Sequence, residues 1–523
     1  MVDFDLNIED FKTLFENSQK PAIVQLMTKV DSICSPLQLY ATLQNAGHSY
    51  LLESVEKEKR HARYSFVGYE PEMVVSIKDR YITIECQMNS ELTKHIYNKL
   101  KSMGDVESLI GGKFRVKVNE GDDALAAFRK IYPTSTGTQM LNQKRFDRQT
   151  FLGGAIGYNS YDLVYDSWLD RDKKPDADVP DMHFAIMSKT FVFDHITNET
   201  YIVITPFVTE SSDLADVYEH AVSEAQLMER SLQMASVISI SEDIPAADTE
   251  QPVANMEQAA YEEAVKIAKQ HIIDGDIFQV VPSRRYTVKM KQTPLQLYIR
   301  LRNINPSPYM YIFNFKDIGI VGASPETLMT VFDRKVITNP IAGTCPRGNN
   351  DEEDRELAQE MLSDKKERAE HVMLVDLGRN DVRMVSKGGT VKVDDLMSVV
   401  KYSHLQHIES TVSGELRDEC DQFDATRAIF PAGTLSGAPK IRAMEIIDEL
   451  EPESRGIYGG GVGYYSWNGD ADFAIVIRTV LIKNNTAYVQ AGAGIVADSD
   501  PTYEYNETER KMAAMIKAIG GKQ

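Results

Sequence analysis

The sequence predicts an α+β fold, because hairpin signals and long helices occur without a regular alternation of strand and helix. Thr190 to Asp194 and Thr200 to Ile204 alternate in polarity around a polar turn, as two paired strands do. Phe473 to Ile482 and Thr486 to Ala491 flank a short Lys-Asn-Asn turn in the same way. No internal repeat of about 20–50 residues is visible, which argues against a solenoid or a propeller.

A linker separates two halves of the chain. Apolar residues recur at helical spacing from Leu214 to Leu232, so a helix closes the first half. The stretch from Ser239 to Asn255 is acidic, has two prolines and lacks periodicity, as linkers do. Ala259 to Ile273 then predicts a helix that leads into a strand at Gln279. We therefore predict a first half at residues 1–238, a linker at 239–255 and a second half at 256–523.

The composition is that of an ordinary globular protein with a formal charge of −21 over 523 residues. This charge argues against nucleic acid or an anionic membrane surface as a partner. An anionic substrate remains compatible, because a site needs only local cations such as Arg478 and Lys511. The four cysteines are scattered without metal-binding or disulfide spacing, which fits a reducing compartment: Cys34, Cys86, Cys345 and Cys420.

The N-terminus begins MVDFDLNIEDF, which lacks the basic start and apolar core of a signal peptide. No apolar run approaches the roughly 20 residues that a membrane helix needs. We therefore expect a cytoplasmic protein.

Ten unusual segments follow one another in the second half. They are IFQVVPSRR (Ile277–Arg285), ASPE (Ala323–Glu326), PIAGT (Pro340–Thr344), ERAEHVMLVDLGRND (Glu367–Asp381), HLQHIES (His404–Ser410), PAGTLSGAPK (Pro431–Lys440), RGIYGGGVGY (Arg455–Tyr464), IVIRT (Ile475–Thr479), AGAGIV (Ala491–Val496) and EYNETERK (Glu504–Lys511). In this order they resemble the chorismate-utilising enzymes, most closely the anthranilate synthase component I family. The resemblance implies two large, twisted, mostly antiparallel sheets packed as a sandwich with helices outside. It also implies that the N-terminal half is built around the same core.

Two positions separate the reactions within this family. In aminodeoxychorismate synthases a lysine that attacks the ring occupies the position of Ala342, and alanine has no nucleophile. In isochorismate and salicylate synthases a lysine that activates water occupies the position of Gln279, and an amide is a poor base. Each residue taken alone also fits a packing position or a polar strand position. Within the family pattern, the pair leaves ammonia as the expected nucleophile.

The resemblance therefore implies an anthranilate synthase large subunit, which makes anthranilate and pyruvate from chorismate and ammonia in the first committed step of tryptophan biosynthesis. Two alternatives are a sister chorismate enzyme, such as an aminodeoxychorismate synthase, and a non-catalytic tryptophan-binding regulatory subunit. Ala342 and Gln279 argue against the first alternative. The intact acid, histidine and glutamate positions described next argue against the second.

Two pairs of glutamates indicate a metal site. Glu367 and Glu370, and likewise Glu504 and Glu507, lie three residues apart, so each pair projects from one helix face. Four carboxylates brought together would repel one another, and some would take up protons unless a cation lay among them. Mg²⁺ fits such a site, because it prefers oxygen ligands. Pairs of this spacing are also common on solvated helices. The resemblance implies that Glu370 and Glu507 bind Mg²⁺ directly and that Glu367 and Glu504 hold its waters.

Three further residues match the catalytic positions of the family. Glu326 matches a general acid for the C4 hydroxyl of chorismate, a role that requires burial to raise its pKa. His407 matches a proton shuttle for the loss of pyruvate, and Thr434 matches a residue that orients the substrate. Without the resemblance, a capping or ion-paired glutamate and a core histidine fit these positions as well.

Other residues are expected to hold the anionic substrate. Arg478 interrupts an apolar strand and is explained either by a substrate carboxylate or by an internal salt bridge. Backbone amides at Gly492, Ala493 and Gly494 can approach an anion, although such a sequence also fits a tight turn. Further matches to substrate positions are Thr344, Tyr458 and Lys511. The chain departs from the family at Cys345, where arginine is usual, and at Arg510, where asparagine is usual.

Two segments match those that bind tryptophan as an inhibitor in this family. They are LLES (Leu51–Ser54) and NPSPYM (Asn305–Met310). Each segment alone fits an ordinary strand end or a loop shaped by proline. The expected tryptophan-binding residues are Glu53, Ser54, Pro308, Tyr309 and Met310.

The source of ammonia is expected to be another chain. No cysteine here lies in the glycine-rich turn of a glutaminase nucleophile, and the remaining length does not accommodate a glutaminase domain. A glutamine amidotransferase subunit (component II) is therefore the expected partner.

Overall fold

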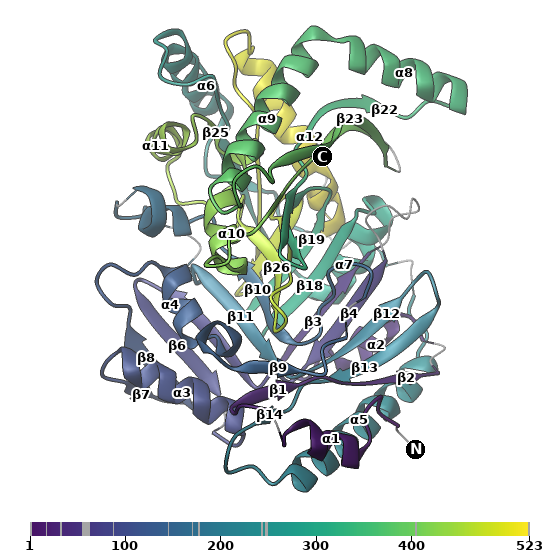
Figure 1. The fold of residues 1–523 in the computed structure, drawn as a ribbon. Coiled ribbons are helices and arrows are strands. Elements are labelled where there is room, and N and C mark those ends of the chain that lie inside the picture. Colours follow the sequence, from purple (N-terminus) through teal and green to yellow (C-terminus); the bar gives the residue numbers. More distant parts are fainter. Residues whose placement is uncertain are drawn as a thin grey trace.

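The computed structural model describes residues 3–16, 18–31, 34–54, 63–86, 88–144, 146–169, 171–175, 178–241, 244–245, 249–402 and 405–520. His404 and part of the predicted linker lie outside these ranges. Two large sheets pack face to face and helices cover their outer faces (Figure 1). Every strand pairing within the two large sheets of the described residues is antiparallel. The predicted α+β sandwich is confirmed.

The first sheet has 13 strands in the part of the chain that the structure describes. In spatial order they are β22 (Ile341–Pro346), β24 (Leu405–Glu415), β21 (Lys335–Thr338), β20 (Thr327–Phe332), β27 (Ala471–Ile475), β26 (Gly461–Ser466), β10 (Gly154–Asn159), β11 (Met182–Met187), β5 (Met73–Lys78), β6 (Tyr81–Cys86), β8 (Lys113–Lys117) and β7 (Glu107–Leu109), with β23 (Lys392–Lys401) also paired to β24.

The second sheet has 11 strands among the described residues. They are β15 (Val253–Ala254), β17 (Ser283–Lys289), β29 (Thr486–Gly492), β28 (Thr479–Lys483), β19 (Ile318–Ser324), β18 (Tyr309–Phe315), β3 (His48–Glu53), β4 (Tyr64–Tyr69), β12 (Lys189–Asp194), β13 (Glu199–Ile204) and β2 (Leu26–Val30). Smaller sheets join β14 (Phe207–Val208), β1 (Ala22–Val24) and β9 (Gln139–Leu141), and β16 (Gln279–Val280) to β25 (Gly437–Ala438). Strands from both halves of the sequence occur in each large sheet, so the linker divides the sequence but not the sheets.

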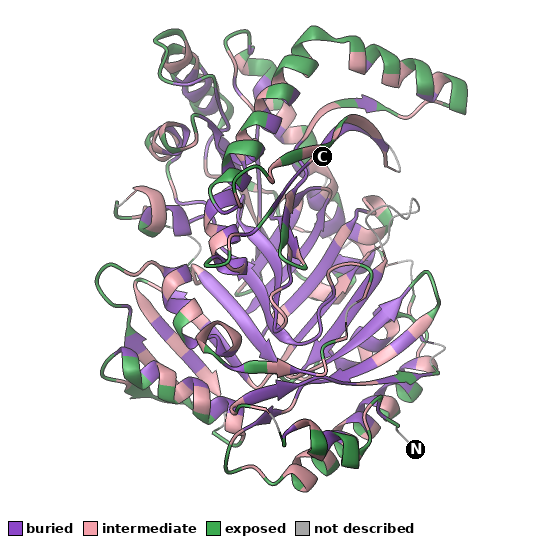
Figure 2. Ribbon diagram, viewed as in Figure 1, coloured by how far each residue is buried: buried purple, intermediate pink, exposed green. Residues whose placement is uncertain are grey.

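The helices lie outside the sandwich, with exposed outer faces and buried inner faces (Figure 2). They are α1 (Ile8–Leu14), α2 (Pro36–Leu43), α3 (Glu91–Met103), α4 (Ala124–Ile131), α5 (Leu214–Ser236), α6 (Gln258–Ile273), α7 (Pro294–Ile304), α8 (Asp351–Ser363), α9 (Lys365–Arg383), α10 (Gln422–Ile429), α11 (Lys440–Leu450) and α12 (Pro501–Ile519). The predicted helices ending at Leu232 and Ile273 correspond to α5 and α6. None of the described helices is both apolar and long enough to cross a bilayer.

Strand β18 shows how alternation builds the layers. Tyr311 and Phe313 belong to the core between the sheets, together with Tyr158 and Tyr464 of the 13-stranded sheet. Met310 and Ile312 belong instead to the core beneath the outer helices. This period of two places every second residue of β18 between the sheets.

The predicted strand from Phe473 to Ile482 is wrong as a single element. Strand β27 ends at Ile475 and β28 begins at Thr479, and the two lie in different sheets. Between them the chain crosses the sandwich, with Arg478 in the left-handed region at φ 49°. Continuous apolarity reflects burial throughout the crossing and not a straight strand.

Candidate active site

Glu326 lies where the chain passes from β19 in one sheet to β20 in the other. Its side chain is buried, and the Thr434 hydroxyl donates to its Oε1 at 2.8 Å. Burial raises the pKa of Glu326 to about 7, although Thr434 and the charges of Lys511 and Arg478 oppose this shift. A carboxyl with this pKa can hold a proton near neutral pH, as a general acid must.

The strand that follows Glu326 is irregular. Thr327 pairs with Ala474 of β27 and Met329 pairs with Phe473, so the register shifts at Leu328. Such bulges commonly lie beside active sites, where they redirect a side chain. The Ile475 amide donates to the Glu326 carbonyl at 3.0 Å and anchors the backbone just before the bulge.

His407 of β24 is neutral at physiological pH. Burial lowers its pKa to about 4, and the hydrogen bond with the Gly343 carbonyl and the charge of Glu409 only partly oppose this shift. Its Nδ1 lies 3.1 Å from the Gly343 carbonyl oxygen and 3.0 Å from Thr344 Oγ1. Because a carbonyl oxygen only accepts, Nδ1 carries the proton and Nε2 keeps its lone pair. His407 is therefore suited to accept a proton at Nε2.

The Arg478 guanidinium makes no hydrogen bond or ion pair with any described residue. Burial lowers its pKa, and Tyr402 and Glu326 partly offset this effect. The internal salt bridge that was one explanation for this residue is thus not formed among the described residues. A partly buried cation without an anion is suited to bind one, and a carboxylate matches its fork geometry.

The segment from Gly492 to Gly494 lies among several predicted substrate residues. A Cβ atom at Gly492 would lie 3.1 Å from the Tyr458 hydroxyl, so glycine allows this close approach. Lys511 of α12 donates from Nζ to the Gly492 carbonyl at 3.0 Å. A Cβ atom at Gly494 would lie only 2.6 Å from Gln279 Nε2. The structure therefore brings Tyr458, Lys511 and Gln279 around one backbone segment.

Gln279 lies in β16, which pairs with the Ala438 segment that follows Thr434. Its Nε2 donates to Glu370 Oε1 of α9 at 3.1 Å, and its buried Oε1 has no partner among the described residues. Ala342 pairs with Ile408, next to His407. Neither Gln279 nor Ala342 supplies a basic or nucleophilic side chain.

The four predicted metal ligands lie on α9 and α12, which both rise above the sheets in the upper part of Figure 1. Burial and the charge of Glu370 raise the pKa of Glu367, and burial raises that of Glu504 despite a hydrogen bond from Ser499. Burial alone would raise the pKa of Glu507, but Lys511 and Arg510 outweigh it and lower this pKa. No group of three metal-binding side chains is already assembled among the described residues. The carboxylates nevertheless have the oxygen chemistry that suits Mg²⁺.

The two departures from the family differ in their surroundings. Cys345 is buried against Met361 and Ile408, and burial raises the pKa of its thiol. Arg510 instead forms an ion pair with Glu507, one of the predicted metal ligands, at 2.7 Å.

Replacing Arg510 with asparagine is expected to tighten Mg²⁺ binding by up to about fivefold, because an exposed ion pair is worth up to about 1 kcal/mol. The measurement is the Mg²⁺ concentration that gives half-maximal activity. Arg379→Asn, which breaks an ion pair on the surface of α9, serves as the control. An unchanged Mg²⁺ requirement in Arg510→Asn would show that the ion pair does not compete.

Three residues near the site escaped the sequence analysis. Glu409 is buried one strand step beyond His407, and its charge helps to raise the pKa of Glu326. His371 is fully buried beside Glu370 and bonded to Ser410 at 2.6 Å. The ring of Tyr402 packs edge-on against His407 at 5.4 Å. Its position in the sequence HIES, an acid within a predicted strand, could have indicated that Glu409 has a role in the site.

The predicted tryptophan segments meet, since β3 pairs with β18 and Glu53 lies opposite Met310. The Ser54 hydroxyl donates to the Pro308 carbonyl at 3.1 Å. Glu53 is already held, because Arg302 donates to both of its oxygens at 2.9 and 3.1 Å and Tyr298 donates at 2.7 Å. Glu53 is therefore already bonded within the chain, and its contact with tryptophan stays a prediction.

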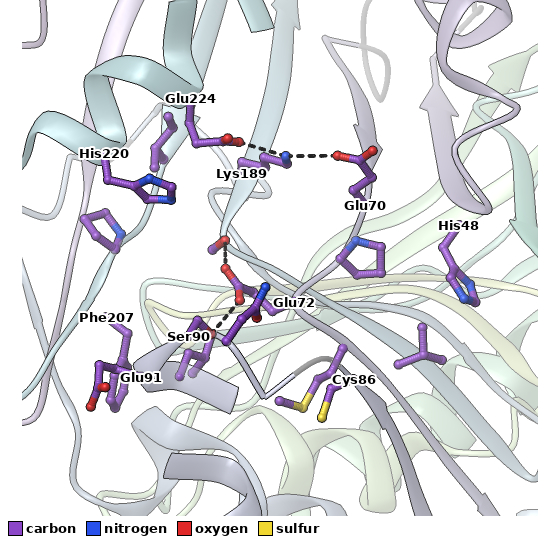
Figure 3. Close-up of a pocket in the computed structure, with 18 of the residues that line it drawn as sticks. His48, Glu70, Glu72, Cys86, Ser90, Glu91, Lys189, Phe207, His220 and Glu224 are labelled. Carbon is purple, nitrogen blue, oxygen red and sulfur yellow. Dashed lines mark hydrogen bonds and ion pairs between the residues drawn. The ribbon is translucent and has the colours of Figure 1, made fainter. Parts of the chain in front are cut away.

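Cavities occur both at and away from these residues. One of about 30 Å³ adjoins Glu326 and Thr434 and has room for a molecule the size of water. Another of about 1030 Å³ has none of the predicted site residues in its lining. There Lys189 lies between Glu70 and Glu224, as Figure 3 shows.

Known proteins resemble this chain along nearly its full length. A family model described as chorismate binding enzyme matches residues 99–517. Anthranilate synthase component 1 of Haloferax volcanii is 46% identical over 98% of this chain and 97% of its own, and that of Pseudomonas aeruginosa is 40% identical over 98% of each. The crystal structure of anthranilate synthase component I from Streptococcus pneumoniae has a TM-score of 0.68 at 34% identity, covering 88% of this chain and 93% of that one.

Proposed function

Since the chain belongs to the chorismate binding enzyme family, as one of its anthranilate synthase component 1 members, we propose that it aminates chorismate with ammonia and releases anthranilate and pyruvate. The observation that carries this choice is the pair of Ala342 and Gln279. The first offers no nucleophile, and the second is a buried amide bonded to Glu370. An amine from outside the chain is then the group left to attack the ring.

The two half-reactions balance without a redox partner. Ammonia forms a C–N bond at C2 of chorismate while the C4–O bond breaks and its oxygen leaves as water. Loss of the C2 proton then breaks the bond from C3 to the enolpyruvyl oxygen, which makes the ring aromatic. The expelled enolpyruvate takes up a proton and becomes pyruvate. One chorismate and one ammonia thus yield one anthranilate, one pyruvate and one water.

The residues divide these proton transfers between them. Glu326, with a pKa of about 7, gives its proton to the leaving C4 oxygen, and Thr434 holds the carboxyl in place. His407 accepts a proton at Nε2 during the loss of pyruvate. Arg478 binds a carboxylate of the substrate, because its own charge has no partner among the described residues.

The carboxylates of α9 and α12 fit a magnesium ion. Glu370 and Glu507 would bind it, and Glu367 and Glu504 would hold its waters. Mg²⁺ would withdraw charge from the ring carboxylate during attack at C2. The raised pKa values of Glu367 and Glu504 support this assignment, because a cation relieves the cost of crowding these acids in partly buried positions.

We also propose inhibition by tryptophan at the contact between Ser54 and Pro308. Glu53 would support that site through its bonds to Arg302 and Tyr298. None of the four cysteines, all of which are described residues, forms a disulfide, and this fits a reducing cytoplasm. None of them lies in a glutaminase-like turn, so a separate glutamine amidotransferase, component II, would supply the ammonia.

The purified chain is expected to make anthranilate from chorismate, Mg²⁺ and ammonium salts, and not from glutamine. Activity should rise from pH 7 to 8 at fixed total ammonium, because the attacking species is free ammonia. Anthranilate fluorescence and product mass measure the outcome. Glutamine-dependent product from the single chain, or a 4-amino product, would contradict the proposal.

A further inference from the structure

Tyr309 connects the predicted tryptophan segment to the segment that carries Glu326. Its ring belongs to the partly buried residues packed against the core between the sheets. The phenol donates to Asp472 Oδ1 at 3.0 Å and lies 2.9 Å from Thr327 Oγ1. Because the carboxylate can only accept, the phenol proton points to Asp472 and the Thr327 hydroxyl donates to the phenol oxygen. The three side chains therefore form one ordered chain of hydrogen bonds.

These bonds hold the chain at the irregular point that follows Glu326. Thr327 is the next residue, and the register shift between Thr327 and Met329 begins there. Asp472 lies on β27, the strand opposite the bulge, and also accepts from Gln149 Nε2 at 3.0 Å. Tyr309 belongs to the other sheet, so its hydroxyl links the two sheets across the bulge.

The other end of this link is the backbone contacted by Ser54. The Ser54 hydroxyl donates to the carbonyl of Pro308, the residue immediately before Tyr309. A ligand seated against Ser54 and Pro308 would displace this carbonyl or its hydroxyl partner. Because Pro308 and Tyr309 share a peptide unit, any rotation there moves the Tyr309 ring and its hydroxyl.

We propose that the Tyr309 hydroxyl is a positioning group that holds Glu326 through Thr327 and so transmits tryptophan binding to the acid. This inference rests on the proposed function and adds the route by which regulation reaches the site. When the hydroxyl keeps its two bonds, the bulge presents Glu326 to Thr434. When they are broken, the Glu326 segment loosens and admits water.

Replacing Tyr309 with phenylalanine tests the route, because this change removes one oxygen and keeps the ring. We expect kcat with saturating ammonium to fall about 5- to 20-fold while KM for chorismate stays within about twofold. The alkaline limb of the kcat profile should move to lower pH by at least about half a unit, since water reaching Glu326 lowers its pKa.

Tryptophan binding and inhibition should separate in the same variant. In the unaltered chain, saturating tryptophan is expected to lower the rate at least about fivefold. In Tyr309→Phe, tryptophan should bind with an affinity within about threefold, measured by calorimetry, yet lower the rate less than about twofold.

Tyr50→Phe is the matched control. The Tyr50 hydroxyl lies 2.9 Å from Thr190 Oγ1 in the same sheet, and its ring also belongs to the core between the sheets, but Thr190 is remote from Glu326 in the fold. In this variant the alkaline limb of the kcat profile and the inhibition by tryptophan should be the same as in the unaltered chain. The route would be overturned if both variants showed the same changes. It would also be overturned if Tyr309→Phe left both the alkaline limb of the kcat profile and the inhibition by tryptophan unaltered. Either result would leave the proposed function standing. An unaltered chain that fails to bind tryptophan would overturn the coupling, and one that makes no anthranilate would overturn the proposed function itself.

Discussion

Glu326→Gln is expected to lower kcat for ammonia-dependent anthranilate formation about 10²- to 10⁴-fold, the usual contribution of a positioned general acid. Glutamine has nearly the same shape but carries no transferable proton. The Thr434 hydroxyl can still donate to the amide oxygen, so the local packing should persist. KM for chorismate should change little, because the lost interaction belongs to the transition state.

The raised pKa of Glu326 also predicts the direction in which activity changes with pH. Burial holds the pKa of Glu326 at about 7, so the protonated form falls as pH rises through 7. The kcat/KM calculated per free ammonia should therefore decline above pH 7 in the unaltered chain and become flat in Glu326→Gln. A group with a raised pKa loses its stabilising effect as pH rises through that value, so the variant should be at least as thermostable at pH 8. Near-normal activity in a folded Glu326→Gln would contradict the assignment.

Glu370→Gln is expected to weaken activation by Mg²⁺ at least about 100-fold, which corresponds to about 2.7 kcal/mol. The change removes one negative charge and keeps an oxygen that can accept from Gln279. Charge, and not packing, is therefore what the variant loses. Titration of activity with Mg²⁺, and direct calorimetry of Mg²⁺ binding, measure the effect.

Two further variants test which carboxylates bind the metal directly. Glu367→Gln, at a position expected to hold metal-bound water, should cost about 10-fold in affinity. Glu356→Gln, on the exposed face of α8, should leave Mg²⁺ activation unchanged. Full activity in excess chelator, or equal effects of all three variants, would refute the magnesium site.

Local sequence patterns were sufficient to predict many of the individual helices and strands. The helix spacing of Glu367 and Glu370 and the caps at Asp364 and Asp500 place both carboxylate pairs within the first two turns of α9 and α12. The hairpin of β12 and β13 also follows from alternation around a polar turn. Local propensity and periodicity decide such elements because each depends on residues close in the sequence.

The points at which the chain crosses from one sheet to the other could not be predicted from local sequence patterns. The apolar run around Arg478 looks like one strand, yet it leaves the 13-stranded sheet at Ile475 and enters the other at Thr479. Burial makes both strands and the crossing apolar alike, so hydrophobicity carries no mark of the break. Arg478 lies within that crossing, and its guanidinium has no hydrogen bond or ion pair among the described residues.

By itself, the sequence determined the α+β fold class and the helices that carry the glutamates, because those follow from residue type and near-neighbour spacing. The chemistry that Ala342 and Gln279 exclude follows from the resemblance to the family together with their residue types. Only the tertiary structure decided that burial brings Glu326 to a pKa of about 7 and His407 to about 4, since a pKa shift depends on every neighbour that excludes water. It also decided that Arg302 already holds Glu53 and that the Tyr309 hydroxyl reaches Thr327. These contacts join residues 249 and 18 positions apart, and long-range packing alone sets which side chains meet.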